Sequence, residues 1–392
     1  MASPVDTTIK WFTSKMLGAP VLRGQAGSLI AILDACLVNG WGVQVASSCV
    51  VSGGVCTLTF PLDHAAPVDT VILVEGASIA ALNGEQKVTA TAPNVVKFAT
   101  AAANGTATGT ITAKMAPAGY AKPFSGTNLA VYKSLSVAGN GHFCRVNDAN
   151  ALYARANAYE TMTAVSTGTG LAPTATQISG GIYWHKSLVA NAAPLDWYCV
   201  SDGRMFYFGN SSYQANDIGG NAGPYASSVS GPIFGFGDPI PKGSAPDPFS
   251  TMLFGGVTSG NGYSSSTLFQ ASYSASNWNY VLRVIAGTGT AQGLNCLPYS
   301  GSLAAEPVLD SASGRIRVSK IYGSTDTTQA RRVDIPGIYM SDATYLEKAL
   351  THLTTFKIGN PERTHLATLS ADSVGQVSAT RLVSFDITGP WR

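Results

Sequence analysis

The chain has little charge for its length. Only 12% of its 392 residues are Asp, Glu, Lys or Arg, whereas roughly 25% is usual. The 24 basic and 22 acidic residues are scattered and give a net charge of +2. No basic run indicates binding to nucleic acid or to an anionic membrane. A surface this poor in charge favours a subunit that hides part of its surface in an assembly.

Long hydrophobic runs are also missing. The N-terminal stretch "MASPVDTTIKWF" has no apolar core, so we expect no secretory signal. Residues 41–62 carry no charge, but Gly53-Gly54 and an alternating pattern indicate strands there and not a membrane span. We therefore expect no membrane insertion.

The six cysteines lack metal-binding spacing. None lies in a C-x-x-C motif, which predicts reduced, mostly buried thiols in a protein made in a cytoplasm. Cys49 and Cys56 flank a predicted hairpin that turns at Gly53-Gly54. A two-residue turn places Cys49 opposite Leu58 and Cys56 opposite Val51. The two cysteines are then diagonal neighbours, so a disulfide between them is possible but not favoured.

Recognisable catalytic motifs are absent. No G-x-S-x-G elbow occurs, and the five histidines form no H-x-x-x-H pair. The stretch with Gly287, Gly289 and Gly293 misses the G-x-G-x-x-G spacing by one residue. Acidic residues such as Asp310 and Asp334 are not marked as a glycan-cleaving pair by their local sequence. We therefore expect a protein that is not an enzyme, with no cofactor and no metal.

What the sequence does contain is mostly β-strand pattern. Residues 1–25 predict an extended N-terminal arm, which we expect to clasp a neighbouring subunit. "SLIAILDACLVNG" predicts one helix over 28–39, with Ser28 as its N-cap and Asn39-Gly40 as its stop. From 41 to about 115, short alternating segments separated by turn residues predict a compact β-sandwich or barrel.

The remainder of the chain, 119–392, is predicted to be a larger β-rich domain. "DWYCVSDGRMFYFG" is the clearest hairpin signal, with two aromatic strands around Asp202-Gly203. We expect its aromatics to be exposed on the strands and to serve a subunit interface. They are Trp197, Tyr198, Phe206 and Tyr207. A second short helix is plausible over 342–353.

Two long loops stand out in this larger domain. Residues 209–231 and 256–266 are nearly uncharged and rich in Tyr, Ser, Gly and Asn, a composition typical of adaptable binding surfaces. Tyr213, Tyr225 and Tyr263 are the candidate receptor or subunit contacts. The alternative is that both loops are packing or surface loops.

Together these patterns predict a mainly β fold. A small N-terminal β-sandwich or barrel module with one short helix precedes a larger β-sandwich-like domain. The expected divisions are an arm over 1–25, the helix plus the small β-domain over 26–118, and the larger domain over 119–392.

Several stretches resemble a group of poorly characterised virion structural proteins of tailed bacteriophages, associated with the tail or baseplate. They are the opening "MASPVDTTIKWFTSKMLGAPVLRGQAGSLIAILDACLVNGWG", then "ALNGEQKVTAT", "KPFSGTNLAVYKS", "YETMTAVSTGTG", "GGIYWHKS", "DWYCVSDGRMFYFG" and the ending "FDITGPWR". The resemblance is densest over 1–210 and weakest over 209–330. It implies a virion component that is assembled in the host cytoplasm, without a cofactor.

The leading expectation is thus a non-enzymatic structural subunit of a tail, baseplate or fibre-attachment region. Its partners would be copies of itself, as a homo-oligomer, and other virion proteins. Three alternatives stay open. The first is a capsid decoration protein. The second is a receptor-binding protein that contacts the host cell surface through the loops 209–231 and 256–266. The third is a glycan depolymerase at a tail tip.

Overall fold

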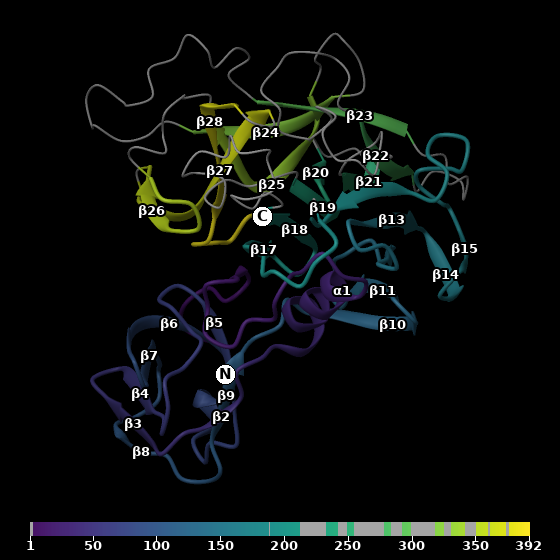
Figure 1. Ribbon diagram of the computed structural model, residues 1–392. Coiled ribbons are helices and arrows are strands. Elements are labelled where there is room, and N and C mark those ends of the chain that lie inside the picture. The colour runs from purple at the N-terminus through teal and green to yellow at the C-terminus, as the bar shows by residue number, and fades with distance from the viewer. Residues whose placement is uncertain are drawn as a thin grey trace.

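A computed structural model describes residues 3–187, 189–211, 233–241, 249–254, 278–283, 292–298, 318–324, 331–341, 350–359, 361–373 and 376–392. Figure 1 shows three parts: a small β-module, a central sheet with helix α1, and a large sheet above them. Every strand pairing in the described residues is antiparallel. The expectation of a mainly β, sandwich-like fold is confirmed.

The N-terminal module is an eight-stranded sheet in the order β2-β9-β5-β6-β7-β4-β3-β8. Its elements are β2 (Gln44–Val45), β3 (Ser48–Ser52), β4 (Val55–Thr59), β5 (Val71–Glu75), the 3₁₀ turn η2 (Ala80–Leu82), β6 (Gly84–Ala92), β7 (Val95–Ala99), β8 (Gly105–Thr106) and β9 (Thr112–Met115). Long β6 pairs with β5 through its first half and with β7 through its second half, with a register shift between Val88 and Ala90. This shift lets one strand serve both halves of the sandwich.

The predicted hairpin at Gly53-Gly54 is confirmed, including its register. Cys49 lies opposite Leu58 and Val51 opposite Cys56. Burial alternates along β3, so Cys49 and Val51 face the core. Period-two alternation and a two-residue turn are enough to fix such a local pairing.

The predicted helix over 28–39 is present, as α1 (Ser28–Leu33) followed by one π-helical segment, η1 (Asp34–Asn39). The expected N-cap is wrong. Gly27 occupies the cap position with φ 79°, and the Ser28 hydroxyl instead donates to the carbonyls of Arg23 and Gln25. The cap comes from a residue far along the chain, Asp148, whose Oδ2 accepts hydrogen bonds from the backbone N–H groups of Leu29 (2.8 Å) and Ile30 (3.2 Å).

The helix packs against a central five-stranded sheet in the order β10-β11-β12-β13-β16. The strands are β10 (Tyr120–Gly126), β11 (Leu129–Ser134), β12 (Phe143–Asn147), β13 (Tyr153–Tyr159) and β16 (Ile182–His185), with a small ribbon of β14 (Thr161–Ala164) and β15 (Thr167–Thr169) beside them. Tyr132 on β11 donates its hydroxyl to Asp34 Oδ1 at 2.9 Å, which ties the helix to this sheet.

The large sheet contains 13 strands within the described residues, in the order β1-β17-β18-β19-β21-β22-β23-β24-β25-β28-β27-β26, with β20 paired to β25. They are β1 (Lys10–Thr13), β17 (Trp197–Ser201), β18 (Met205–Asn210), β19 (Ile233–Gly237), β20 (Ile240–Pro241), β21 (Phe249–Phe254), β22 (Trp278–Arg283), β23 (Gln292–Pro298), β24 (Ser319–Ser324), β25 (Arg331–Ser341), β26 (Thr355–Ile358), β27 (Arg363–Ser373) and β28 (Gln376–Asp386). Of the second helix expected over 342–353, residues 342–349 lie outside the described residues, and 350–353 are not helical.

The β17–β18 hairpin forms around Asp202-Gly203 as predicted, but its aromatics are not exposed. Trp197, Tyr198, Phe206 and Tyr207 are all 0% exposed. On one face, Phe206 and Phe208 pack against Trp184 of the central sheet, at ring-centroid distances of 6.3 and 5.7 Å. The expectation of an aromatic subunit interface here is therefore wrong.

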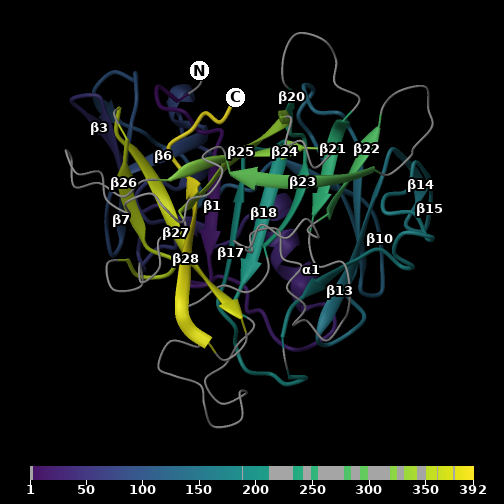
Figure 2. The ribbon, with the colours of Figure 1, turned by 90° about the horizontal axis from the view of Figure 1, so that it is seen from above.

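The other face of the same hairpin is covered because the large sheet folds back over it. Tyr198 and Tyr207 pack against Phe385 of β28, at 5.4 and 5.2 Å between ring centroids. Figure 2 shows β27 and β28 beside β17, and β23 passing across β18. The hairpin is thus the middle layer of the molecule, and alternation alone could not reveal a second covering layer.

The N-terminal segment lies within its own chain. β1 forms the edge strand beside β17, and all four of its residues are buried. Trp197 Nε1 donates to the carbonyl of Pro20 at 2.9 Å, and Trp11 Nε1 donates to the carbonyl of Asp69 at 3.0 Å. The segment therefore joins the large sheet to the N-terminal module.

Candidate interaction surface

An open apolar groove lies on the N-terminal module. Its volume is about 580 Å³, and three separate segments line it: residues 17–18, residues 42–44, and residues 61–63 with Ala65. Leu17, Val43 and Leu62 are 56%, 63% and 70% exposed, respectively. Exposed apolar side chains are ordinary when they are scattered singly, and three around one concavity make this groove the candidate contact surface.

The groove is held in shape by residues behind it. Gln44 Nε2 donates to the carbonyl of Asp63 at 2.6 Å, which ties β2 to the segment after β4. Gly42 has φ 70°, and a Cβ there would lie 3.2 Å from Ala65 Cβ, so only glycine fits this approach without strain. Trp41 packs beside Phe12 with ring centroids 5.1 Å apart, which joins the groove's base to β1.

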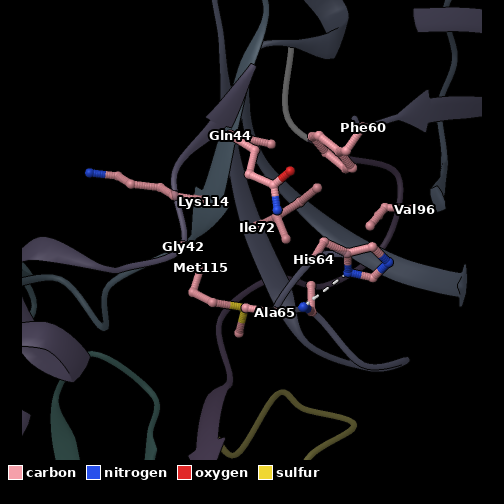
Figure 3. Close-up of a pocket in the computed structure, with 11 residues that line it drawn as sticks. Gly42, Gln44, Phe60, His64, Ala65, Ile72, Val96, Lys114 and Met115 are labelled. Carbon is pink, nitrogen blue, oxygen red and sulfur yellow. Dashed lines mark hydrogen bonds between the residues drawn. The ribbon is translucent and has the colours of Figure 1, made fainter. Parts of the chain in front are cut away.

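A small pocket behind the groove is no binding site. It shares Gly42, Gln44 and Ala65 with the groove, and Figure 3 shows it between β-strands of the module. Its volume of about 20 Å³ holds one water molecule at most. Small-molecule sites usually reach several hundred Å³, roughly 300 or more.

His64, in the wall of this pocket, is fully engaged in local hydrogen bonds. Its Nδ1 accepts the Ala66 backbone N–H at 3.1 Å. We therefore assign the proton to Nε2, which lies 2.9 Å from the carbonyl oxygen of Ala92 and 2.8 Å from the Thr91 hydroxyl. A ring with both nitrogens occupied in this way orders the loop and does not offer a base to a substrate.

A second exposed apolar site is the loop that follows β11. Leu135 is 65% exposed and Val137 is 105% exposed. The loop is anchored at its ends, because Ser134 donates its hydroxyl to the carbonyl of Gly203, and the Asn140 N–H donates to Asp238 Oδ2 at 3.1 Å. Its two apolar side chains therefore project from a fixed base.

Four other histidines are buried, and none sits in an open site. Burial lowers the pKa values of His142, His185, His352 and His365 to about 4, because each ring loses hydration of its charged form. All four are therefore neutral at pH 7. Across the described ranges, no group of three or more His, Cys, Asp or Glu side chains could hold a metal ion.

A fully buried ion pair beside α1 is structural. Lys186 donates to Asp148 Oδ1, and both side chains are 0% exposed. Burial raises the pKa of Asp148 and lowers that of Lys186, while their mutual attraction opposes both shifts. Lys186 also donates to the carbonyl of Gln25 at 2.8 Å, so the pair fixes the start of α1 against β13 and β16 and has no access for a substrate.

The structure does not describe the contact residues that the sequence predicts. Tyr213, Tyr225 and Tyr263, with nearly all of loops 209–231 and 256–266, lie outside the described residues. Sequence reasoning missed Leu17, Val43 and Leu62. The pattern around residues 41–45 was misleading, because Trp41 and Val43 share a period-two position and yet only Trp41 is buried.

Comparison with known protein families, curated proteins and solved structures gives no match. Among the residues that the structure describes, no helix has the length and apolar character needed to cross a membrane.

Proposed function

We propose that this chain is a non-enzymatic structural subunit of a tailed-phage virion, in the tail, baseplate or fibre-attachment region, and that it assembles with copies of itself. The observation that carries the assembly role is the groove around Leu17, Val43 and Leu62. The 12% charged content supports the same role, because a surface meant for contact carries fewer Lys and Glu residues. The virion assignment rests on the sequence resemblance.

The proposed occupant of the groove is a second copy of the chain. The described residues contain ten exposed large hydrophobic side chains: three line the groove, and two form the loop at Leu135 and Val137. We propose that the apolar loop of one copy fills the apolar groove of the next. Contact between different patches of identical subunits is heterologous and closes into a ring when the rotation allows it.

The first experiment measures oligomer size. We expect mass photometry of the purified chain to show an oligomer, and the double variant Leu17→Ser, Leu62→Ser to be monomeric. The variant Leu135→Ser, Val137→Ser should be monomeric as well. A matched control is Val50→Ser, which changes an exposed valine of β3 that does not line the groove. Unchanged oligomers in both double variants would exclude the groove as the contact.

Mixing the two double variants sharpens this test. The groove variant retains an intact loop, and the loop variant retains an intact groove, so only one contact can form between them. We expect heterodimers and nothing larger. Larger oligomers in the mixture would contradict a groove-to-loop contact.

A second experiment addresses the virion assignment. Particles that carry this chain should lose it, or fail to assemble, when the groove variant replaces it. Copy number then separates the locations, since a tail part is present in a handful of copies and a capsid decoration protein in hundreds. If the chain is absent from purified particles, the virion assignment fails while the self-association result stands.

A further inference from the structure

The N-terminal module contains two free thiols in contact. Cys49 on β3 and Cys56 on β4 are 1% and 0% exposed, and their Sγ atoms lie 3.5 Å apart. They occupy diagonal positions of one hairpin, since Cys49 pairs with Leu58 and Cys56 with Val51. The two sulfur atoms therefore need to approach by about 1.5 Å to reach the bonding distance of a disulfide.

The surroundings of this pair allow that approach. The connecting turn is Gly53-Gly54, and a Cβ at Gly53 would meet nothing within 4 Å. On its outer side, β3 pairs only with the two-residue strand β8. The turn itself carries no side chain that would resist a shift of the hairpin, whereas Cys49, Val51, Cys56 and Leu58 stay packed in the core.

The two thiols also differ in the direction of their pKa shifts, and thiol–disulfide exchange begins from a thiolate. The hydrogen bond from Cys56 lowers the pKa of the Cys49 thiol and raises that of Cys56. Of the two thiols, Cys49 is the one whose pKa is lowered, and the thiolate is the nucleophile in thiol–disulfide exchange.

We propose that Cys49 and Cys56 are a latent cross-link, reduced during synthesis and closed by a low-molecular-weight disulfide once the protein leaves the reducing cytoplasm. When the hairpin opens locally and exposes Cys49, its thiolate attacks the small disulfide, forming a mixed disulfide and releasing one thiolate. Cys56, after losing its proton to solvent, then attacks the Cys49 sulfur and releases the second. Two protein thiols are oxidised, and one small disulfide is reduced to two thiols. The cross-link joins the two strands of the β3–β4 hairpin.

The other buried cysteines provide the contrast. Cys36 of η1 interacts with Cys199 of β17 in the middle of the core, where burial raises the pKa of Cys36 well above its usual value. Cys144 is 0% exposed and its thiol pKa is also raised by burial. The pKa of neither Cys36 nor Cys144 is lowered, so among the described cysteine side chains oxidation should be confined to residues 49 and 56.

The experiment uses the full chain, purified under reductant and then incubated with excess oxidised glutathione under native conditions. Free thiols are then alkylated in denaturant, and the peptides are identified by mass spectrometry without reduction. We expect a peptide cross-linked between Cys49 and Cys56, with the other four cysteines alkylated. The thermal midpoint of the module should rise by several degrees on oxidation and return on reduction.

Two variants make the assignment specific. Cys56→Ser should stop at a mixed disulfide of glutathione on Cys49, because the resolving thiol is missing. The matched control Cys144→Ser should still form the cross-link. Six alkylated cysteines in the native, oxidant-treated chain, or cross-linking at Cys36 and Cys199 instead, would overturn the proposal. None of these readouts depends on oligomer size or on presence in a virion, so the proposal can fail independently of the proposed function.

Discussion

Two regions of this molecule carry large apolar side chains and end in opposite environments. The hairpin of β17 and β18 is aromatic on both faces and fully buried, because the central sheet covers one face and β28 covers the other. The edge of the N-terminal module, at Val43 and Leu62, is exposed. Strand alternation assigns side chains to the two faces of a sheet. Whether a face is exposed depends on which other segments of the chain pack against it.

Low pH should destabilise the central and large sheets more than the N-terminal module, and this is the largest effect that we expect. His142, His185, His352 and His365 pack in or against the central and large sheets, each with a pKa of about 4 against 6.5 when unfolded. The unfolded chain therefore binds more protons between these values. Stability is complete above pH 6.5 and is lost as the pH falls toward 4, by about 3 kcal/mol per histidine.

Chemical denaturation between pH 7.5 and 4.5 checks this expectation. The raised pKa values of Asp148 and Asp238 act in the opposite sense, and four histidines outweigh them. The variant His352→Gln should reduce the slope of unfolding free energy against pH, whatever it does to stability at pH 7.5. A free energy that is constant across this range would show that the histidines are not neutralised by burial.

A core truncation in the hairpin is the next largest effect. Trp197 is 0% exposed, stacks on Phe208 at 6.1 Å between ring centroids, and donates to the carbonyl of Pro20. Trp197→Ala should lower the free energy of unfolding by about 4 kcal/mol, because it leaves a large cavity and an unpaired carbonyl. Urea denaturation measures the loss. A change below about 1 kcal/mol would place this side chain at the surface.

The smallest effect on stability is expected in the groove. Leu62 is 70% exposed, so Leu62→Ser should change the free energy of unfolding by no more than about 0.5 kcal/mol. The same substitution, combined with Leu17→Ser, is the one expected to abolish self-association. Urea denaturation of the single variant therefore sharpens the comparison: a loss of several kcal/mol would mean that Leu62 belongs to the core.

Local features could be predicted well from the sequence. The hairpin at Gly53-Gly54, the helical span 28–39 and the hairpin at Asp202-Gly203 each depend on neighbouring residues, and all three are present. The candidate site could not be predicted, because Leu17, Val43 and Leu62 come from three segments that only the fold brings together. The division into an arm and two domains, and the role of Tyr213, Tyr225 and Tyr263, stay predictions.

The sequence by itself determined which side chains share a face and where the chain turns, since alternation and turn residues act over a few positions. Only the tertiary structure decided the helix cap and the covering of each face. Asp148 caps α1 from 119 positions beyond Leu29 and is buried against Lys186. No local pattern marks such a partner, because the hydrogen bond depends on the β12–β13 turn and β16 meeting the helix in space. Burial of Trp197 and exposure of Leu62 have the same origin: a face is buried only when a distant segment packs on it.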